Sequence, residues 1–294
     1  MEGAAMNGAD VVYLNGEYLP AGEAKVSVLD RGFLFGDGIY EVIPVYGGRL
    51  FRLEAHLLRM DQSLSGIRLA NPLTHRGWEA ILTELVARNG GGDMALYLQV
   101  TRGVSPREHA FPPDAIPTVF VMTQPLNPQA DATLQAGVKA ITVEDIRWKH
   151  CHIKAITLLP NVLLQQQAAE SGAAEAILVR NGEITEGTAS NVFIVTRGHV
   201  VTPPRGRLLL PGITRDLVVE LCTEAGIPCS ESKVALSALR RADEVWLTSS
   251  NKEVVPVTHV DGLPVGSGRP GPVWEQVFGL YRAYKEAFRR GEVH

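Results

Sequence analysis

The sequence predicts a mixed α/β protein made of two domains, with α+β character. Its 294 residues are about twice the length of a typical domain, so each half could bury a hydrophobic core of its own. Segments with helical spacing of apolar residues occur beside strand-like segments, and no repeated period indicates a solenoid or a propeller. A composition of 45% hydrophobic and 20% charged residues is typical of a compact globular chain.

Two stretches of the sequence set the predicted limits of the domains. The opening residues, MEGAAMNGAD, carry neither the basic start nor the apolar stretch of a signal peptide, and we expect residues 1–10 to form a disordered tail. The segment QPLNPQADATLQAG is polar, contains two prolines and has no apolar period, which is typical of a linker. We therefore place a small α/β domain at residues 11–128 and a larger, strand-rich domain at residues 129–294.

Periodicity predicts two helices and two strands in the small domain. In residues 52–66 apolar side chains recur at helical spacing and a glycine ends the pattern, and residues 77–91 repeat it before their own glycines. Residues 94–103 and 118–125 alternate apolar with polar side chains or carry β-branched residues, which favours strands. We therefore expect two amphipathic helices beside a set of strands.

The larger domain is expected to be a strand-rich core with peripheral helices. An Asn-Gly pair at residues 181–182 favours a two-residue hairpin turn, and Asn161 is placed to cap a helix that ends at Gly172. The other predicted elements are strands at residues 138–146, 151–159 and 244–251, a helix at residues 212–226 and a closing helix at residues 272–290.

Charge and hydropathy argue against several classes of partner. The chain has 28 lysines and arginines against 32 aspartates and glutamates, a formal charge of −4, and no basic run, so we expect neither nucleic acid nor a membrane surface as a partner. No apolar run approaches the roughly 20 residues that a membrane-spanning helix needs. We therefore expect the partner of this protein to be a small molecule.

The cysteine pattern indicates a reducing compartment. The three cysteines, Cys151, Cys222 and Cys229, are an odd number and include no CxxC pair. This argues against a disulfide framework and against a structural zinc site, so no metal is expected. A cytoplasmic location fits this pattern best.

The motifs of several common nucleotide-binding and hydrolytic sites are absent: the chain contains no GxGxxG, P-loop, HExxH or GxSxG. Lys154 is the most distinctive of the remaining candidates. It lies between Ile153 and Ala155 with apolar residues following, a setting that would remove water from the ammonium, as a Schiff-base lysine requires. The alternative is a strand lysine that points to solvent.

Two further charged residues are candidates, each with a plain alternative. Glu186 is followed by the small-residue stretch Gly187 to Asn191, which would let the backbone approach a ligand closely, but a solvated surface glutamate also fits. Arg59 stands beside Met60 on the first predicted helix. It is either an anion ligand or a surface arginine whose stem packs on apolar neighbours.

The turn Pro211-Gly212-Ile213-Thr214 precedes a predicted helix, where free N–H groups and the positive end of the helix dipole favour a phosphate. The Thr214 hydroxyl would add a donor, and Thr248-Ser249-Ser250 at the end of a strand would supply a second set. The alternatives are an ordinary helix cap and an ordinary turn.

The segment TRGVSPREHAFPP suggests a carboxylate-binding pair. Arg107 and His109 are two residues apart, so in an extended segment both side chains face the same way and could bind one carboxylate. Pro106 and the run Phe111-Pro112-Pro113 favour an extended loop. The alternative is a polar surface loop.

Seven stretches, taken in chain order, resemble successive stretches of the fold-type IV pyridoxal-phosphate aminotransferases. They are DRGFLFGDGIYEV, LEAHLLRM, QVTRGVSPREHAFP, VEDIRWKHCHIKAITLL, EAILVRNGEITEGTASNVF, LLPGITRD and LTSSNKEVVPV. The similarity runs from about Val12 into the C-terminal helix, and within the family it is greatest to the D-amino acid aminotransferases. It implies two domains with the cofactor, pyridoxal 5′-phosphate, in the cleft between them, and a homodimer with loops contributed across the interface.

The resemblance also implies roles for the candidate residues. Lys154 matches the Schiff-base lysine that moves a proton between the substrate α-carbon and the cofactor C4′, and Glu186 matches the carboxylate that faces the pyridine nitrogen. The residues that match the cofactor-binding positions are Arg59, Ile213, Thr214 and Ser250 at the phosphate and Leu210 at the ring. Those that match the binding site for the substrate α-carboxylate are Tyr40, Arg107 and His109.

The implied reaction is a ping-pong transamination through an aldimine of Lys154, in which D-alanine and 2-oxoglutarate give pyruvate and D-glutamate. A branched-chain L-amino acid aminotransferase or an aminodeoxychorismate lyase would keep Lys154 and Glu186 but bind its substrate differently. Pro44, Ala189 and Asn251 depart from the D-amino acid pattern near the expected substrate pocket, so the side-chain preference stays open. A non-catalytic protein that binds a phosphate ligand at Thr214 is the alternative outside enzymes.

Overall fold

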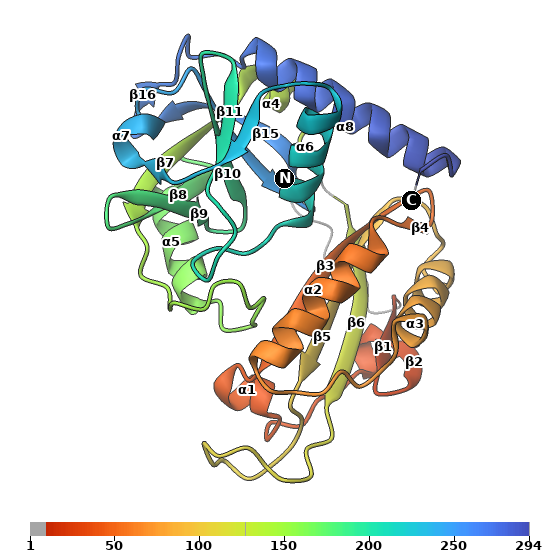
Figure 1. Cartoon of the computed structure of the whole chain (residues 1–294). Coiled ribbons are helices and arrows are strands. Elements are labelled where there is room, and N and C mark those ends of the chain that lie inside the picture. Colours follow the sequence, from red (N-terminus) through yellow and green to blue (C-terminus); the bar gives the residue numbers. More distant parts are fainter. Residues whose placement is uncertain (1–9, 127, 294) are drawn as a thin grey trace. The chain divides into compact units, whose positions relative to one another are not determined.

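The structure, a computed structural model, describes residues 10–126 and 128–293, which divide into two compact units (Figure 1). Unit 1 consists of residues 10–126, 153–157 and 288–293. Unit 2 consists of residues 128–152 and 158–287. The predicted tail at residues 1–10 lies outside the described residues except for Asp10. The predicted cofactor cleft between two domains stays a prediction.

Unit 1 is built on an antiparallel sheet of six strands in the order β2-β1-β6-β5-β3-β4. Its strands are β1 (Val11–Leu14), β2 (Glu17–Pro20), β3 (Gly38–Tyr46), β4 (Arg49–Leu50), β5 (Met94–Thr101) and β6 (Thr118–Pro125). Its helices are η1 (Ala21–Glu23), α1 (Arg31–Phe35), α2 (Leu53–Gly66) and α3 (His75–Arg88). The two predicted helices and two predicted strands are confirmed as α2, α3, β5 and β6.

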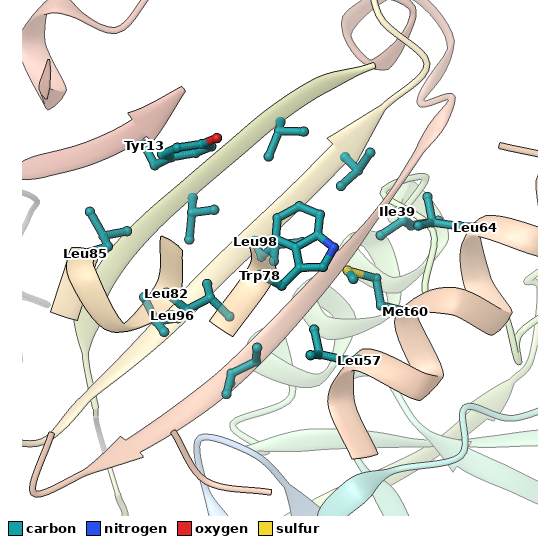
Figure 2. Packing of buried hydrophobic residues seen from close by; sticks show 14 of the residues in the cluster. Tyr13, Ile39, Leu57, Met60, Leu64, Trp78, Leu82, Leu85, Leu96 and Leu98 are labelled. Carbon is teal, nitrogen blue, oxygen red and sulfur yellow. The ribbon is translucent and has the colours of Figure 1, made fainter. Parts of the chain in front are cut away.

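Helices α2 and α3 pack against this sheet through one hydrophobic core (Figure 2). Trp78 of α3 and Met60 of α2 are fully buried there, and each such side chain contributes about 1.5–3 kcal/mol of hydrophobic stabilisation. Alternate residues of β3 point into the core because successive side chains of a strand face opposite sides; they are Ile39, Ile43 and Val45. The same alternation places Tyr40 and Glu41 on opposite faces of the sheet.

Unit 2 is built on a mixed sheet of ten strands, in which β12-β11-β10-β14-β15-β7-β8-β9-β13 are neighbours in that order and β16 pairs with β15. The strands are β7 (Val138–Glu144), β8 (Glu175–Arg180), β9 (Glu183–Gly187), β10 (Asn191–Thr196), β11 (His199–Thr202), β12 (Cys229–Glu231), β13 (Val234–Ala235), β14 (Glu244–Ser249), β15 (Glu253–Val260) and β16 (Leu263–Pro264). The helices are α4 (Asp131–Ala136), α5 (Leu159–Glu170), α6 (Ile213–Glu224), α7 (Leu236–Leu239) and α8 (Pro272–Arg290), whose last residues belong to unit 1. Two sheets with packed helices confirm the predicted α/β class.

Strand β14 lies between β10 and β15 in the sheet of unit 2 and is packed on both sides. Its Trp246 lies directly opposite Phe193 of β10, and the two rings stack with centroids 6.0 Å apart. Trp246 Nε1 donates to Glu244 Oε2 at 3.0 Å, so the one polar atom of this buried ring is satisfied. Helix α6 packs against the same strand. The packing therefore fixes the position at which β14 ends, at Ser249.

The predicted strand at residues 151–159 is wrong. Residues 151–158 form turns and irregular backbone, Leu159 begins α5, and Ala155 makes an isolated antiparallel bridge with Ile39 of β3. The apolar pattern that suggested a strand instead buries Ile153 and Ala155 in the core of unit 1. The chain belongs to unit 1 here for residues 153–157 only. This short stretch pairs with β3 through a single bridge and does not form a strand.

Other local predictions in unit 2 are partly corrected. The helix expected to be capped by Asn161 begins at Leu159, and the Asn161 side chain instead donates to the Thr188 carbonyl at 2.7 Å. The polar segment predicted as a linker contains α4, which buries Leu134. The Asn181-Gly182 hairpin is confirmed, since both residues have the positive φ of a type I′ turn, 53° and 79°.

Helix α8 starts at a buried carboxylate of β14. Glu244 accepts hydrogen bonds from the N–H groups of Val273 and Trp274 at 3.0 and 2.8 Å, which satisfies the free donors of the first turn. A Cβ on Gly271 would lie about 2 Å from this carboxylate, so the approach requires glycine. In the part of the chain that the structure describes, neither α8 nor any other helix has the length and apolarity to span a membrane.

Candidate active site

Lys154 lies in the short segment of unit 1 that runs along the edge of β3. The Tyr40 N–H donates to the Lys154 carbonyl at 3.0 Å, and the Lys154 N–H donates to Ser63 Oγ of α2 at 3.1 Å. The backbone on both sides of the side chain is thus fixed by a strand and a helix. The side chain itself is half-buried.

The Lys154 amine lies over an aromatic ring. Its Nζ is 4.2 Å from the centroid of the Tyr40 ring, a cation–π contact worth about 0.5–2 kcal/mol. Tyr40 stacks in turn on Tyr97, with ring centroids 5.7 Å apart. Burial, together with the nearby Tyr40, raises the pKa of Tyr97 to about 12, so that phenol stays neutral and donates to Gln99 at 2.7 Å. The stacked rings of Tyr40 and Tyr97 therefore orient the amine.

Arg59 is buried on the opposite face of β3, where Glu41 holds its guanidinium. Arg59 Nε donates to Glu41 Oε1 at 2.8 Å and Nη2 to Oε2 at 2.6 Å, a bidentate pair. Burial acts to raise the pKa of Glu41, but the Arg59 charge, with His56, lowers it well below its usual value. Burial, with the charges of Arg59 and Lys154, lowers the pKa of His56, whose Nδ1 lies 2.9 Å from Glu41. Glu41 is therefore an anion and His56 neutral at pH 7.

Arg107 and His109 lie in the loop between β5 and β6, and both side chains are exposed. The Arg107 guanidinium is 5.5 Å from the centroid of the Phe35 ring, and the His109 ring is 5.6 Å from it. The two side chains thus share one aromatic neighbour, as their spacing allows. Among the described residues, neither side chain forms a hydrogen bond, ion pair or ring contact with Tyr40 or Lys154 of the same chain.

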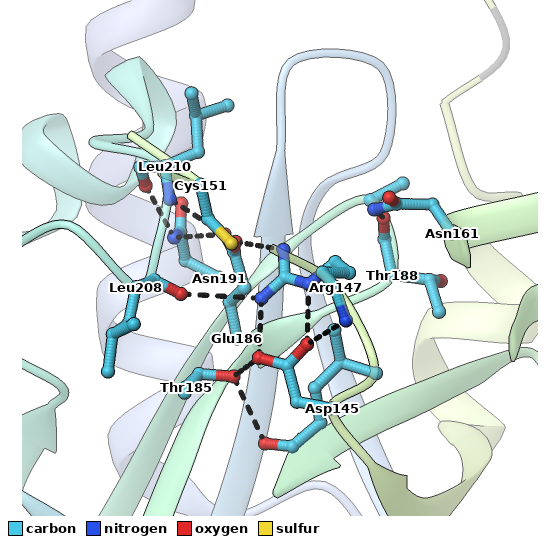
Figure 3. Close-up of polar contacts among 12 residues, drawn as sticks. Asp145, Arg147, Cys151, Asn161, Thr185, Glu186, Thr188, Asn191, Leu208 and Leu210 are labelled. Atoms are coloured by element: carbon cyan, nitrogen blue, oxygen red, sulfur yellow. Dashed lines mark hydrogen bonds and ion pairs between the residues drawn. The ribbon is translucent and has the colours of Figure 1, made fainter. Parts of the chain in front are cut away.

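In unit 2, Glu186 is a buried carboxylate at the centre of a polar network (Figure 3). It forms a short ion pair with Arg147, and its Oε2 accepts the Leu210 N–H at 3.0 Å and the Asn191 side-chain amide at 3.4 Å. Arg147 is held by Asp145 at 2.9 and 3.0 Å. Burial raises the pKa of Glu186 to about 7, although Arg147 and the Leu210 N–H act to lower it. A second cation beside Glu186 would bring its pKa down.

The N-terminus of α6 lies next to this network. Gly212 is the N-cap and supplies no side chain, so the first N–H groups of α6, at Ile213 and Thr214, lack a side-chain cap. A Cβ on Gly212 would lie 2.0 Å from Asn191 Oδ1, and Asn191 pairs in register with Thr248 of β14. The helix terminus and the end of β14, where Ser250 follows, are therefore at the same end of the sheet. Such a terminus favours an anion.

Three buried polar atoms at this end of unit 2 have no hydrogen-bond partner among the described residues. They are Ser190 Oγ, Thr248 Oγ1 and Asn251 Oδ1. Leaving a buried polar group unpaired costs about 1–3 kcal/mol, so such groups call for a ligand or a water. A ligand with phosphate or carboxylate oxygens and one cationic ring would match the hydroxyls, the helix terminus and Glu186.

The predicted residues are gathered in two sets, one in each unit. The unit 1 set is Tyr40, Arg59 and Lys154, with Arg107 and His109 in the loop beside Phe35. The unit 2 set is Glu186, Leu210, Ile213, Thr214 and Ser250.

Sequence reasoning missed the residues that hold these side chains in place. They are Glu41, His56, Asp145, Arg147 and Asn191. Glu41 and Arg147 stand inside stretches that carried the resemblance, DGIYEV and VEDIRWKH, which is the one signal that could have marked them. Glu41 lies 15 residues from His56 along the chain and Arg147 lies 39 from Glu186, so only the fold makes these pairs visible.

Comparisons with known proteins identify the family of this chain. Residues 38–260 match the family described as Amino-transferase class IV. The chain is 43% identical to the D-alanine aminotransferase of Bacillus licheniformis, covering 90% of this chain and 94% of that protein. It is 40% identical to the D-alanine aminotransferase of Staphylococcus haemolyticus, covering 94% and 98%.

Solved structures share the fold. The branched-chain amino acid aminotransferase of Escherichia coli aligns with a TM-score of 0.88 and 27% identity, covering 94% of each chain. A second branched-chain amino acid aminotransferase, from T.th. and solved with pyridoxamine 5′-phosphate, aligns with a TM-score of 0.88 and 26% identity, also over 94% of each chain.

We expect Glu186→Gln to change how the stability of the ligand-free protein depends on pH. With a pKa raised from 4.5 to about 7, the folded protein keeps this proton where the unfolded chain has lost it, so parental stability falls as pH rises through that window. Gln cannot ionise. The unfolding free energy of the variant minus that of the parent should therefore rise between pH 4.5 and 7, by about 1.4 kcal/mol for each pKa unit.

Urea denaturation at several pH values measures this difference. Glu183→Gln, on the same strand but partly exposed and paired with Lys233, is the matched control for the loss of one carboxylate from β9. A difference for Glu186→Gln that does not rise between pH 4.5 and 7 would contradict the raised pKa.

Proposed function

The chain belongs to the class IV aminotransferases, and from this membership we propose a pyridoxal-phosphate enzyme that transfers the amino group of D-amino acids, D-alanine above all, to 2-oxoglutarate. The observation that carries the proposal is the site of unit 2, where a buried glutamate and an uncapped helix terminus lie together. These two features complement the two ends of the cofactor, a protonated ring nitrogen and a phosphate.

The phosphate end is assigned to residues that donate hydrogen bonds or carry positive charge. They are the Ile213 and Thr214 N–H groups, the Thr214 hydroxyl, Ser250, and Arg59 as the cation. Glu41 would keep the Arg59 guanidinium in one orientation, because two of its donors are already fixed. Leu210 is assigned to the face of the ring.

The ring end is assigned to Glu186. When bound, pyridoxal phosphate supplies a protonated, electron-withdrawing ring that stabilises negative charge at the substrate α-carbon. Glu186 would hold that proton on the ring nitrogen, because an anion beside a cation favours both charged forms. Arg147 would keep the Glu186 carboxylate aimed at this position.

Lys154 is assigned the covalent attachment of the cofactor and the proton transfers. Its Nζ would take the proton from the substrate α-carbon and return it at the cofactor C4′. The backbone contacts to Tyr40 and Ser63, and the cation–π contact to the Tyr40 ring, support a fixed position for this amine. A mobile solvent-facing lysine would not need them.

The substrate α-carboxylate is assigned to Tyr40, Arg107 and His109. Because Arg107 and His109 form no hydrogen bond or ring contact with Tyr40 within one described chain and rest on Phe35 instead, we assign them to the site of a second copy, in a homodimer. Several large apolar side chains near α1 and at both ends of the loop between β5 and β6 are exposed over about half of their surface or more. They are Val28, Leu29, Phe33, Val104 and Ile116. An exposed apolar surface of this kind is typical of a subunit interface.

A branched-chain L-amino acid aminotransferase is the second candidate function, favoured by the solved structures that share the fold. The higher identity to the D-alanine enzymes, 43% against 27%, and the SPREH run favour D-amino acids. A panel of D- and L-amino acids with 2-oxoglutarate as acceptor decides between them. Turnover confined to L-isoleucine, L-leucine and L-valine would overturn the D-amino acid proposal.

We expect Lys154→Ala to lose nearly all turnover and the visible absorbance band that borohydride abolishes, since no other lysine replaces its amine. Pyridoxal phosphate should still bind through the phosphate-end residues, so its affinity should fall less than activity. Absorbance spectra before and after borohydride, with circular dichroism as a check of folding, measure this. A variant that kept the borohydride-sensitive band would contradict the assignment of Lys154.

We expect Arg107→Ala to lower kcat/KM for D-alanine by roughly 10- to 100-fold, which corresponds to about 1.5–3 kcal/mol for a charged hydrogen bond. The efficiency with 2-oxoglutarate should fall as well, since both substrates carry an α-carboxylate. The cofactor absorbance should not change. Arg76→Ala, an exposed arginine of α3, is the control. Parental efficiency in Arg107→Ala would place the carboxylate site elsewhere.

Mixing Lys154→Ala with Arg107→Ala tests the contribution of the second copy. After subunit exchange, some dimers contain one Lys154→Ala copy and one Arg107→Ala copy. If the loop comes from the other copy, one site of such a dimer combines an intact Lys154 with an intact Arg107. If the loop belongs to the site of its own chain, neither site has both residues. We expect activity to recover to about a quarter of the parental value, because half of the dimers are mixed and each has one complete site. No recovery despite proven exchange would place the loop in the site of its own chain.

A further inference from the structure

The loop that carries Arg107 and His109 is long and irregular, yet its function requires a fixed backbone. We define the carboxylate loop as residues 104–116, between β5 and β6. Fixing the backbone of one residue costs about 1–2 kcal/mol, and a long exposed loop has little hydrophobic burial to offset this. Some other interaction must therefore hold the two side chains at a defined separation.

Arg31 provides that interaction. It is the first residue of α1 and is only 3% exposed. Its Nη1 donates to the carbonyls of Glu108 and Ala110 at 2.6 and 3.3 Å, and its Nη2 donates to the carbonyl of His109 at 3.4 Å. One guanidinium thus contacts three successive carbonyls, which fixes the direction of the backbone on both sides of His109.

Asp37 fixes Arg31 in turn. Its Oδ2 accepts Arg31 Nε at 2.8 Å, and the same carboxylate accepts Arg102 Nε and Nη2 at 2.8 and 3.0 Å. Burial acts to raise the pKa of Asp37, but the hydrogen bonds from Arg102 and Arg31 outweigh it, and the pKa is lowered. Asp37 is therefore an anion at neutral pH, and it holds two buried arginines side by side.

Arg102 fixes the second half of the carboxylate loop. Its guanidinium lies 3.7 Å from the centroid of the Phe111 ring. The same guanidinium is anchored to the end of α2, where it donates to the carbonyl of Ile67 at 2.6 Å and to that of Arg68 at 3.3 Å. The loop is thus attached to the body of unit 1 at residues 108–110 and again at Phe111.

Phe35 connects this cluster to the two functional side chains. The Phe35 ring lies 4.8 Å from the Arg31 guanidinium, 5.5 Å from that of Arg107 and 5.6 Å from the His109 ring. Arg31 therefore orients the backbone of the loop and the aromatic ring on which both side chains rest. Arg107 and His109 themselves are exposed, so burial in unit 1 does not substitute for this support.

We infer that Arg31 is a positioning residue of the transamination reaction: through the carbonyls of residues 108–110 and the ring of Phe35 it sets where Arg107 and His109 present their charges to the substrate carboxylate. This inference rests on the proposed function, which assigns Arg107 and His109 to that carboxylate. Arg31 does not touch the substrate. Its effect should therefore be much smaller when Arg107 is absent and only His109 remains to be positioned.

A double-mutant cycle tests the inference. We expect Arg31→Lys, which keeps the charge but loses the planar fork, to lower kcat/KM for both D-alanine and 2-oxoglutarate about 10-fold, mainly through KM. In an Arg107→Ala background the same change should cost less than about 2-fold. The cofactor absorbance should stay parental, and amide hydrogen exchange should accelerate at residues 104–111. A purely structural role would lower kcat/KM equally in both backgrounds.

Two further variants keep the test decisive. Phe35→Leu keeps an apolar side chain while removing the ring, and should reproduce the coupling to Arg107 if Arg31→Lys does not fold. Arg88→Lys, an exposed arginine over the Tyr18 ring, is the matched control and should keep parental efficiency. Equal losses with and without Arg107, or parental efficiency in Arg31→Lys, would overturn the inference. Parental efficiency in Arg107→Ala alone would instead overturn the proposed carboxylate site.

Discussion

The candidate site depends on one constraint, that a charge taken out of water must meet an opposite charge. Removing one partner of a buried pair leaves an uncompensated charge and typically costs about 3–5 kcal/mol. The constraint is met at three places, in the groups Glu41–Arg59, Arg31–Asp37–Arg102 and Asp145–Arg147–Glu186. In each group an arginine has a bidentate or shared carboxylate partner, so the functional side chain beside it is held in one orientation.

The pleat of one strand separates two tasks in unit 1. Tyr40 and Glu41 are neighbours in sequence, but alternation along β3 sends them to opposite faces of the sheet. Tyr40 faces the lysine amine, whereas Glu41 faces α2 and holds Arg59. A shift of register by one residue would exchange the two faces, and the hydrophobic core that packs Ile39 and Ile43 against α2 prevents that shift.

The sequence predicted the family and its reaction better than the local structure around Lys154. Helix periodicity, the Asn181-Gly182 turn and the strand at β14 were predictable, because each depends on neighbours within a few residues. The segment around Lys154 was not, since its apolar residues pack in unit 1 rather than in a strand of unit 2. Two ion pairs were also not predictable: Glu41 with Arg59, and Arg147 with Glu186. In each pair the two residues come from different elements, so no spacing in the sequence encodes the contact.

Three of the unsatisfied buried groups in the described part of unit 2 lie where a ligand is expected. Ser190, Thr248 and Asn251 leave buried polar atoms unpaired, and burial raises the pKa of Glu186 to about 7. Each of these features costs stability in the ligand-free protein, whereas the stacked pair Phe193–Trp246 nearby is fully packed and satisfied. A ligand that pairs with the hydroxyls and places a cation at Glu186 recovers these costs on binding. Binding and stability are therefore coupled in this unit, because a ligand that binds only the folded state stabilises it.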